Sequence, residues 1–274
     1  MARHLPKKRA LAFIDFLGFR SKIEQMPRNV EIYELIKENL NEIKSDLVQR
    51  KSTQLSSPEL GRFGGYYYPL EATQFSDSLV LSVEPKAAGV ETLIEIVGSL
   101  SDRLLMKGLF IRGGIALGWA YHEENIVFGK AMNDAYDIES KKAIFPRVVI
   151  DDLIFKKIPD WCKEMNISRD NDGLLYIKPF TNLIEIKGNV IAIPDCQQLA
   201  DARIQIKKSL SSAKNNPKVY AKYHWLGTKF DEHIAECRQV WRFSASDVEM
   251  IFAHESTGRN RTRKKRVPPS PITS

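Results

Sequence analysis

The chain has 274 residues, 43% of them hydrophobic and 27% charged, which is enough for one large globular domain or two modest ones. No apolar run approaches the roughly 20 residues that span a bilayer. The three widely spaced cysteines argue against a disulfide framework and against a cysteine-based zinc site. The formal net charge of +7 arises mainly in the C-terminal stretch GRNRTRKKRVPPSPITS, which has basic and no acidic residues. Because the rest is nearly balanced, we expect no nucleic-acid partner.

Both ends of the chain are basic. The stretch MARHLPKKRALAFIDF lacks a small-residue cleavage site and contains Asp15 in its apolar part, so we do not interpret it as a signal peptide. We expect a cytoplasmic protein with no membrane partner. Residues 1–9 are interpreted as a basic N-terminal arm and residues 256–274 as a disordered basic tail, either solvated or touching an acidic surface.

Hydrophobic periodicity predicts alternating strands and helices in the first 155 residues. In chain order these are a strand over 10–19, a helix over 29–50, a hairpin made of 66–75 and 78–83 around Ser76-Asp77, a helix over 86–107, a strand over 109–121, a turn at 122–125, a strand over 126–129, a helix over 130–143 and a strand over 147–152. In the predicted helix over 29–50, the apolar positions at helical spacing are Val30, Tyr33, Ile36, Leu40, Ile43 and Leu47.

This order predicts an α+β sandwich of the ferredoxin-like βαββαβ type, with one sheet face covered by helices and the other open. We assign residues 10–195 to this domain. A hairpin over 173–193 is expected to close it. Helices over 196–214 and 217–236 are expected to form a C-terminal helical accessory segment over 196–255.

Two acidic residues occupy related places in this predicted sheet. Asp15 lies within the strand FIDFLGF, and Asp77 lies at the tip of the neighbouring hairpin. Either one alone also fits a core or turn aspartate. Together they would repel each other unless a cation lay between them, and hard oxygen ligands suit Mg²⁺ or Mn²⁺. The apolar side chains expected to fix their direction are Phe13, Phe16, Leu79 and Leu81.

Four short motifs around these acids occur in a meaningful order. They are FIDFLGF, FSDS, RGGIALG over 112–118, and FGKAMNDAYDIE, which supplies Gly129, Asn133, Ala135 and Glu139. Each motif is weak by itself. In this order, over roughly residues 10–155, they resemble the catalytic domain of class III nucleotidyl cyclases.

The resemblance implies a metal-dependent cyclase reaction. Asp15 and Asp77, with the backbone carbonyl of Ile14 or Phe16, would hold two Mg²⁺ or Mn²⁺ ions per site. The ribose 3′-oxygen of a nucleoside triphosphate would attack the α-phosphorus, with pyrophosphate leaving.

Further residues take roles by the same resemblance. Backbone amides around Gly18 and Phe19 would face phosphate oxygens, and Arg112 would bind the triphosphate. Asn133 would orient the ribose. Since such sites lie between two head-to-tail domains, the resemblance implies a homodimer with shared active sites, in which Asn133 acts across the interface from Asp15 and Asp77.

The sequence departs from the family pattern at one catalytic position. Asp137 stands where an arginine normally stabilises the transition state. Lys141, one turn further along the helix, is our candidate for a replacement cation, and Lys187 in IEIKGN is a second one. Both also fit ordinary surface lysines.

The positions that read a purine base also differ, because they hold Thr73 and Ile126. Neither provides the expected charge pattern, whereas Thr73, helped by Gln74, could meet a pyrimidine edge. This form resembles the bacterial pyrimidine cyclases of Pycsar antiphage systems, which make cyclic UMP or cyclic CMP for a separate effector. Open alternatives are a conventional adenylate or guanylate cyclase, a silent cyclase-like regulator, and, with little room for it, a palm-type polymerase.

Three other features receive structural interpretations. The segment HEEN over 122–125 is expected to be a solvated turn rather than a metal site. His224 and His233 fit no common helix face. The stretch KYHWLGTKF, which interleaves basic and aromatic residues, is assigned to amphipathic packing rather than to base stacking.

Overall fold

A computed structural model describes residues 5–19, 70–187 and 191–253, together with isolated positions between 24 and 45. The predicted tail over 256–274 and most of the predicted helix over 29–50 lie outside the described residues. So do residues 66–69, the start of the predicted hairpin.

Within the described ranges, eight strands form one mixed sheet with the order β2-β3-β1-β4-β6-β8-β7, and β5 pairs with β4 beside that path. β4 and β6 are parallel, and the other neighbouring strands of this sheet are antiparallel. The strands are β1 Lys7–Leu17, β2 Leu70–Phe75, β3 Ser78–Val83, β4 Phe110–Glu123, β5 Ile126–Gly129, β6 Val148–Ile150, β7 Ile167–Arg169 and β8 Leu175–Ile177. The predicted α+β class is confirmed, with β1 beginning three residues earlier than expected.

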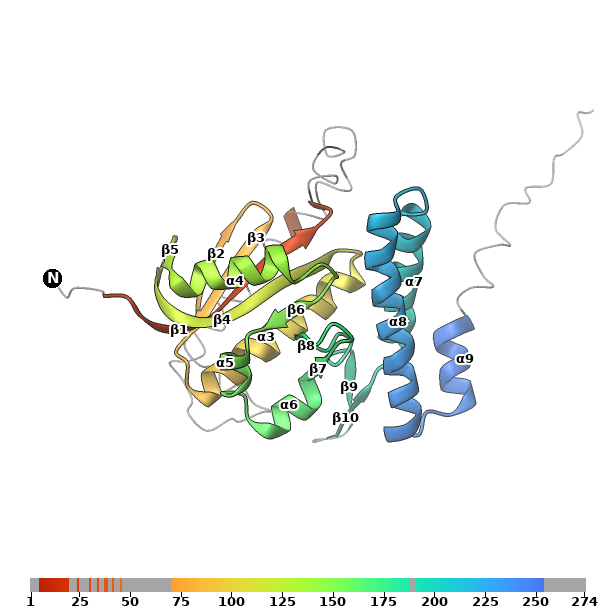
Figure 1. The fold of residues 1–274 in the computed structure, drawn as a ribbon. Helices are drawn as coiled ribbons and strands as arrows, with labels where there is room; N and C mark the ends of the chain where they lie inside the picture. The colour runs from red at the N-terminus through yellow and green to blue at the C-terminus, as the bar shows by residue number, and fades with distance from the viewer. Residues whose placement is uncertain are drawn as a thin grey trace, which may run out of the picture.

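Helices pack on both faces of this sheet (Figure 1). One face of β1, which includes Ile14, packs in a cluster with Leu93 of α3 (Ala87–Met106). The other face, which includes Phe13, packs with Ala135 of α4 (Lys130–Lys141). The prediction of an open face was therefore wrong. Alternate positions of β1 are apolar on both sides, so both faces require a covering layer.

The segment between β6 and the C-terminal helices differs from the predicted single hairpin over 173–193. β7 and β8 form one hairpin on the main sheet, whereas β9 (Ile184–Lys187) and β10 (Ile191–Pro194) form a separate two-stranded sheet. Asp102 of α3 anchors the chain segment between these two hairpins. Its carboxylate accepts hydrogen bonds from the backbone amides of Phe180 at 2.7 Å and Asn182 at 3.0 Å. That anchor turns the chain between the two hairpins.

The remaining described helices are α5 Asp152–Phe155, α6 Asp160–Asn166, α7 Cys196–Ser212, α8 Pro217–Val240 and α9 Ala245–Ala253. Side-chain caps fix the starts of the long ones, since Asp195 accepts hydrogen bonds at α7 and Asn216 does so at α8, where Pro217 follows. None of the described helices is both long and apolar enough to cross a membrane.

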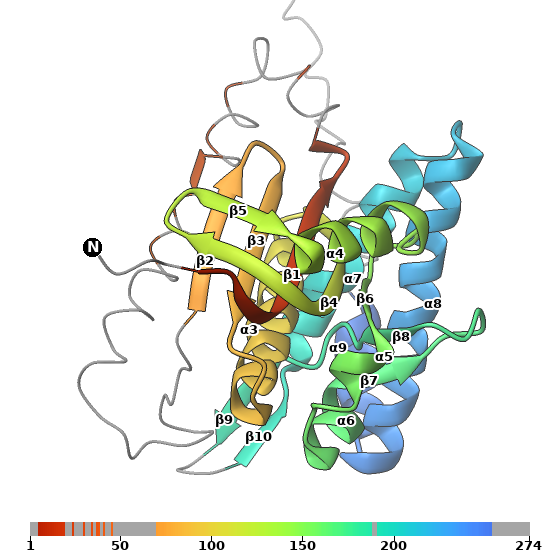
Figure 2. The same ribbon diagram turned by 60° about the vertical axis from the view of Figure 1, so that its left-hand side comes forward.

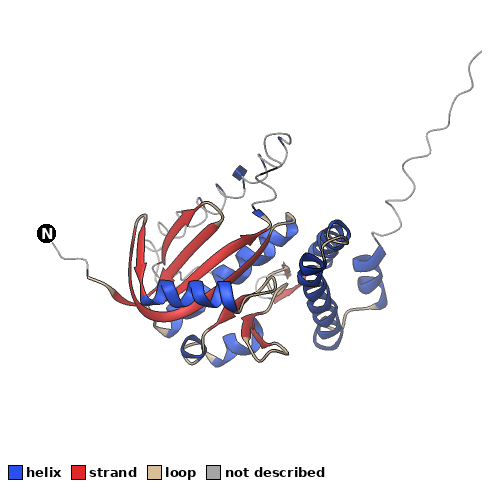
Figure 3. Ribbon diagram, turned by 45° about the horizontal axis from the view of Figure 1, so that its top comes forward, coloured by secondary structure: helices blue, strands red, loops and turns tan. Residues whose placement is uncertain are grey.

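The α7–α8 pair lies beside the sheet rather than on a separate body (Figures 2 and 3). Leu17 of β1 and Phe110 of β4 share one apolar cluster with Ile206 of α7 and with Leu226 and Phe230 of α8. Leu17 and Phe110 are cross-strand partners. They lie on the face that α4 covers further along, so α4 and α8 cover successive parts of one sheet face.

Gly114, the second glycine of RGGI, allows α4 to approach the sheet closely. A Cβ placed on Gly114 would lie 2.3 Å from the Ala135 carbonyl oxygen and 2.6 Å from the Cβ of Ile138. One of these contacts is with backbone, so α4 could make room only by moving as a unit. Gly114 therefore sets the height of α4 above β4.

We expect Gly114→Ala to lower the free energy of unfolding by about 1–3 kcal/mol, the usual cost of overpacking a dense core. Gly227→Ala in α8 is the matched control, because its Cβ would meet only Ile206 and Leu210 at 3.7 and 3.9 Å. Alanine suits a helix interior, so the control should gain up to about 1 kcal/mol. Urea denaturation of both variants checks this, and equal effects would contradict the proposed close contact.

Candidate functional site

The centre of the candidate site is a cross-strand ion pair. Asp15 of β1 faces Ser78 of β3 on one side and Arg112 of β4 on the other. The Nε of Arg112 donates a hydrogen bond to the Asp15 carboxylate at 3.0 Å, and both side chains are about a quarter exposed. The predicted metal ligand and the predicted phosphate-binding arginine therefore touch each other.

A second carboxylate reaches the same guanidinium from α4. The Glu139 side chain is only 4% exposed, and its carboxylate lies 2.6 Å from the Nη2 of Arg112. Burial raises the pKa of Glu139 above its usual value, although Arg112 opposes the rise. The sequence motif includes Glu139 but predicts no role for it. The structure makes it the inner partner of Arg112.

Asp77 lies where the hairpin prediction placed it. β2 and β3 are joined by a tight turn in which Ser76 has a φ of +53°. The amide of Phe16 donates a hydrogen bond to the backbone carbonyl of Asp77 at 2.9 Å. The turn is thereby fixed beside β1, one position from Asp15, so the two acids predicted to bind metal occur at adjoining places in the sheet.

The donor chemistry of these acids fits a divalent cation completed by substrate oxygens. Among the described residues, no group of three or more His, Cys, Asp or Glu side chains is arranged to hold a metal ion. Mg²⁺ commonly takes only one or two protein carboxylates and fills its other positions with water and phosphate oxygens. Asp15 and Asp77 match that pattern, and the strand carrying Ile14 and Phe16 brings backbone oxygens near them.

The strand end after Asp15 adopts the turn that the glycine predicts. Gly18 has a φ of +74°, a conformation that other residues adopt only with strain. Phe19 is buried, and its ring centroid lies 6.1 Å from that of Phe16. The phosphate-binding role of the amides of Gly18 and Phe19 stays a prediction, because residues 20–23 lie outside the described residues.

Three predicted residues of α4 lie away from this pair of strands. Asn133 and Asp137 are exposed, and the amine of Lys141 pairs with the Asp137 carboxylate at 2.8 Å. Spaced four residues apart, they share one helix face that differs from the buried face of Ala135. Within one protomer they do not join Asp15. The side chain of Lys187 is not among those that the structure describes, so its proposed role stays a prediction.

The residues predicted to read the base are separated. The Thr73 hydroxyl donates to the Glu124 carbonyl at 2.6 Å and lies 3.0 Å from Nε2 of His122. Gln74 follows on the opposite face of β2, and Ile126 is 58% exposed on β5. The base contacts of Thr73, Gln74 and Ile126 stay predictions. A contact from Thr73 would have to replace an existing hydrogen bond.

His122 corrects the interpretation of HEEN as a solvated turn. It is 2% exposed within β4, and its Nδ1 lies 2.8 Å from the Ser82 hydroxyl. The turn itself is formed by Glu124 and Asn125. The period-2 alternation of β4 continues through His122, which places this side chain on the same sheet face as Ala120 and makes it part of the strand rather than of the turn.

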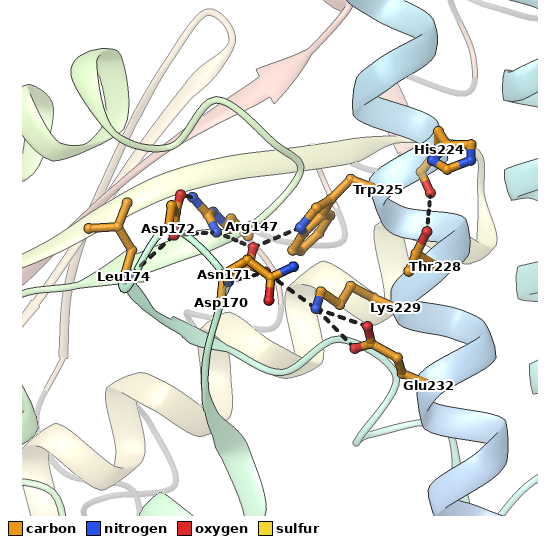
Figure 4. Close-up of polar contacts among 10 residues, drawn as sticks. All are labelled: Arg147, Asp170, Asn171, Asp172, Leu174, His224, Trp225, Thr228, Lys229 and Glu232. Carbon is orange, nitrogen blue, oxygen red and sulfur yellow. Dashed lines mark hydrogen bonds and ion pairs between the residues drawn. The ribbon is translucent and has the colours of Figure 1, made fainter.

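Helix α8 is fixed against the sheet by a buried polar cluster (Figure 4). Asp170, after β7, pairs with Arg147, accepts a hydrogen bond from Nε1 of Trp225 at 2.7 Å and lies 3.3 Å from Nζ of Lys229. The Arg147 side chain is fully buried and pairs also with Asp172. The rings around its guanidinium are Phe145, Tyr176 and Trp225.

The docking of α8 places near the candidate site a residue that the sequence does not identify. Lys222 of α8 is partly buried and interacts electrostatically with Arg112, Asp15 and Glu139. Burial and the positive charge of Arg112 lower its pKa, while the two carboxylates oppose that effect. The spacing of Lys222, Trp225 and Lys229 along one helix face was the available signal.

Comparison with known proteins gives only distant similarity. No protein-family model matches the sequence, and no curated protein matches it. Among solved structures, the catalytic core of a rhodopsin-guanylyl cyclase with converted specificity, in complex with ATPαS, is 12% identical with a TM-score of 0.40. The match covers 63% of this chain and 95% of that one.

Two structures of a bacterial light-regulated adenylyl cyclase are also similar, each with a TM-score of 0.37 and with identities of 12% and 15%. They cover 73% and 63% of this chain, which in turn spans 57% and 51% of theirs.

We expect Arg112→Met to lower the free energy of unfolding by about 1–3 kcal/mol, because it leaves the buried Glu139 carboxylate without its nearest counter-charge. Adding Glu139→Gln removes that charge, so the double variant should recover most of the loss. Denaturant unfolding of the two variants and of Glu139→Gln alone completes the cycle. A double variant no more stable than Arg112→Met would show that Glu139 does not depend on Arg112.

Proposed function

We propose that the chain is a metal-dependent nucleotidyl cyclase that converts UTP or CTP to the 3′,5′-cyclic nucleotide and pyrophosphate. The observation that carries this proposal is the contact between Asp15 and Arg112 at the centre of the sheet, with the Asp77 turn fixed beside them. One strand pair thus provides a carboxylate for a cation and a guanidinium for phosphate, the two groups that a nucleoside triphosphate requires.

In this proposal, Asp15 and Asp77 hold Mg²⁺ or Mn²⁺, which when bound supplies a lowered pKa for the ribose 3′-hydroxyl and charge neutralisation for the phosphates. The 3′-oxygen forms its bond to the α-phosphorus as the bond to the pyrophosphate oxygen breaks. Arg112 exchanges part of its contact with Asp15 for phosphate oxygens, to which its planar fork is suited. Glu139 keeps the guanidinium oriented during that exchange.

The proposed active form is a homodimer with shared sites. Asn133 is exposed and lies apart from Asp15 within one protomer, so it can meet the substrate only if a second copy presents it. Support for such a contact comes from exposed apolar side chains near α4: Trp119 of β4, Phe128 of β5 and Tyr136 are each more than half exposed. Exposed aromatic side chains of this kind favour burial against another protein surface.

The pyrimidine preference rests on the sequence motifs and on the absence of charged purine-reading groups at positions 73 and 126. A role in antiviral defence, with a separate effector that responds to the cyclic nucleotide, rests on the same resemblance. A purine product would make the chain a conventional adenylate or guanylate cyclase in this proposal.

A silent, nucleotide-binding regulator is the second candidate, and one observation favours it. Asp15 is already neutralised by Arg112, and Lys141 is neutralised by Asp137, so neither group is free of a partner. If these pairs persist in the presence of nucleotide, binding can occur without turnover.

The first test incubates the purified protein with Mn²⁺ and each of ATP, GTP, CTP and UTP, with products identified by mass. We expect cyclic UMP or cyclic CMP from the wild type. Asp15→Ala and Asp77→Ala should reduce turnover at least about 100-fold, because each removes a charge-bearing ligand. Asp160→Ala, at an exposed acid in α6, is the matched control and should keep full activity. Activity surviving in both site variants would reject the metal assignment.

A second test addresses the shared site. Asp77→Ala and Asn133→Ala protomers, each inactive alone, should regain about a quarter of wild-type activity when mixed. Half of the random dimers are mixed ones, and each of these has one intact site of two. Turnover measured after mixing and re-equilibration checks this. If the mixture shows no more turnover than the two variants measured separately, Asn133 and Asp77 do not act together in a site shared between protomers.

A further inference from the structure

The site contains a second cation that α4 does not supply. Arg112 contacts both nearby carboxylates, and on α4 the charges of Asp137 and Lys141 cancel each other at the helix surface. Lys222 is the additional described cation that interacts with Asp15, Arg112 and Glu139 together. It comes from α8, from the stretch KYHWLGTKF whose sequence pattern indicates amphipathic packing.

The arrangement of the sheet face explains how α8 reaches this point. Leu17 and Phe110 pair across β1 and β4, and two positions further along Asp15 and Arg112 pair on the same face. The ring of Tyr223 packs on Phe110 with centroids 5.0 Å apart. Its neighbour Lys222 therefore stands at the border between the apolar contact under α8 and the charged pair.

The turn of α8 that carries Lys222 is fixed by the two turns that follow it. One turn further along α8, Trp225 stacks on Phe145 with ring centroids 5.5 Å apart and donates a hydrogen bond to Asp170. One turn beyond that, Lys229 pairs with the same carboxylate. Because these residues share one helix face, docking of α8 through Asp170 necessarily turns Lys222 toward the sheet.

We propose that Lys222 binds the phosphates of the nucleotide substrate and supplies, from α8, the positive charge that α4 lacks at Asp137. This rests on the proposed cyclase function. A bound nucleoside triphosphate adds several negative charges beside two carboxylates. The metal ions of the proposed function offset part of this charge, and the single guanidinium, already shared between those carboxylates, leaves a remainder to balance. A partly buried lysine at the edge of the same ion-pair network can do so, because its ammonium group is held close without being fully paired.

The test measures phosphate binding apart from turnover. Inorganic tripolyphosphate with Mn²⁺ is titrated into full-length wild type, Lys222→Met, Lys222→Arg and Lys208→Met by calorimetry, and turnover of the four nucleoside triphosphates is followed in parallel. Lys222→Met keeps the aliphatic stem and removes the charge. Lys208, exposed on α7, is the matched control for loss of one positive charge from the helical pair.

We expect Lys222→Met to weaken tripolyphosphate binding at least about tenfold, as loss of a charge-assisted hydrogen bond does. Lys222→Arg should remain within about threefold of the wild type, and Lys208→Met should match it. KM for the preferred nucleotide should rise in step with the loss of tripolyphosphate affinity.

Other outcomes overturn the inference in distinguishable ways. A wild type that neither binds tripolyphosphate nor forms a cyclic nucleotide overturns the proposed function and this inference with it. An active wild type with an unaffected Lys222→Met variant overturns the inference alone. If Lys222→Met and Lys222→Gln both lose their cooperative unfolding transition, or if Lys222→Arg is as weak as Lys222→Met in a folded protein, Lys222 serves packing and not phosphate.

Discussion

The guanidinium of Arg112, shared between Asp15 and Glu139, is the interaction on which the arrangement of the described domain depends. It connects two central strands with the helix that covers them, beside an apolar cluster on the same sheet face. A buried carboxylate such as Glu139 is tolerable only with a counter-charge. The same pair of charges that holds α4 in place therefore also defines where an anionic ligand would compete for Arg112.

The local elements were predictable because their patterns are strong. FIDFLGF, the Ser76-Asp77 turn and the RGGI strand appear in the structure as β1, the β2–β3 turn and β4, and their pairing brings Asp15 beside Arg112. The α9 helix was not predicted. Its start has a capping box, in which the Asp247 carboxylate accepts from the Ser244 amide at 2.7 Å and the Asp247 amide donates to the Ser244 hydroxyl at 3.1 Å.

What could not be predicted involves contacts between segments distant in the chain. The burial of His122 depends on Thr73 and Ser82 from other strands. The local period-2 pattern can extend β4 through His122, but it does not show which side chains cover this residue. Lys222 likewise reads as one more basic residue of an amphipathic helix. The hydrogen bond from Trp225 to Asp170, about fifty residues earlier in the sequence, sets the direction of that helix face together with the apolar contacts of α8.

The Arg147–Asp170 pair joins the C-terminal helices to the rest of the described domain, so they are not an appended module. The ring of Trp225 packs against the guanidinium of the fully buried Arg147, and Lys229 forms a second ion pair with Asp170. Cutting the chain before α7 would leave a charged pair partly uncovered and an apolar edge at Leu17 and Phe110 facing water. The apolar core of the described domain therefore continues across residue 195, because side chains of α7 and α8 cover side chains of β1 and β4.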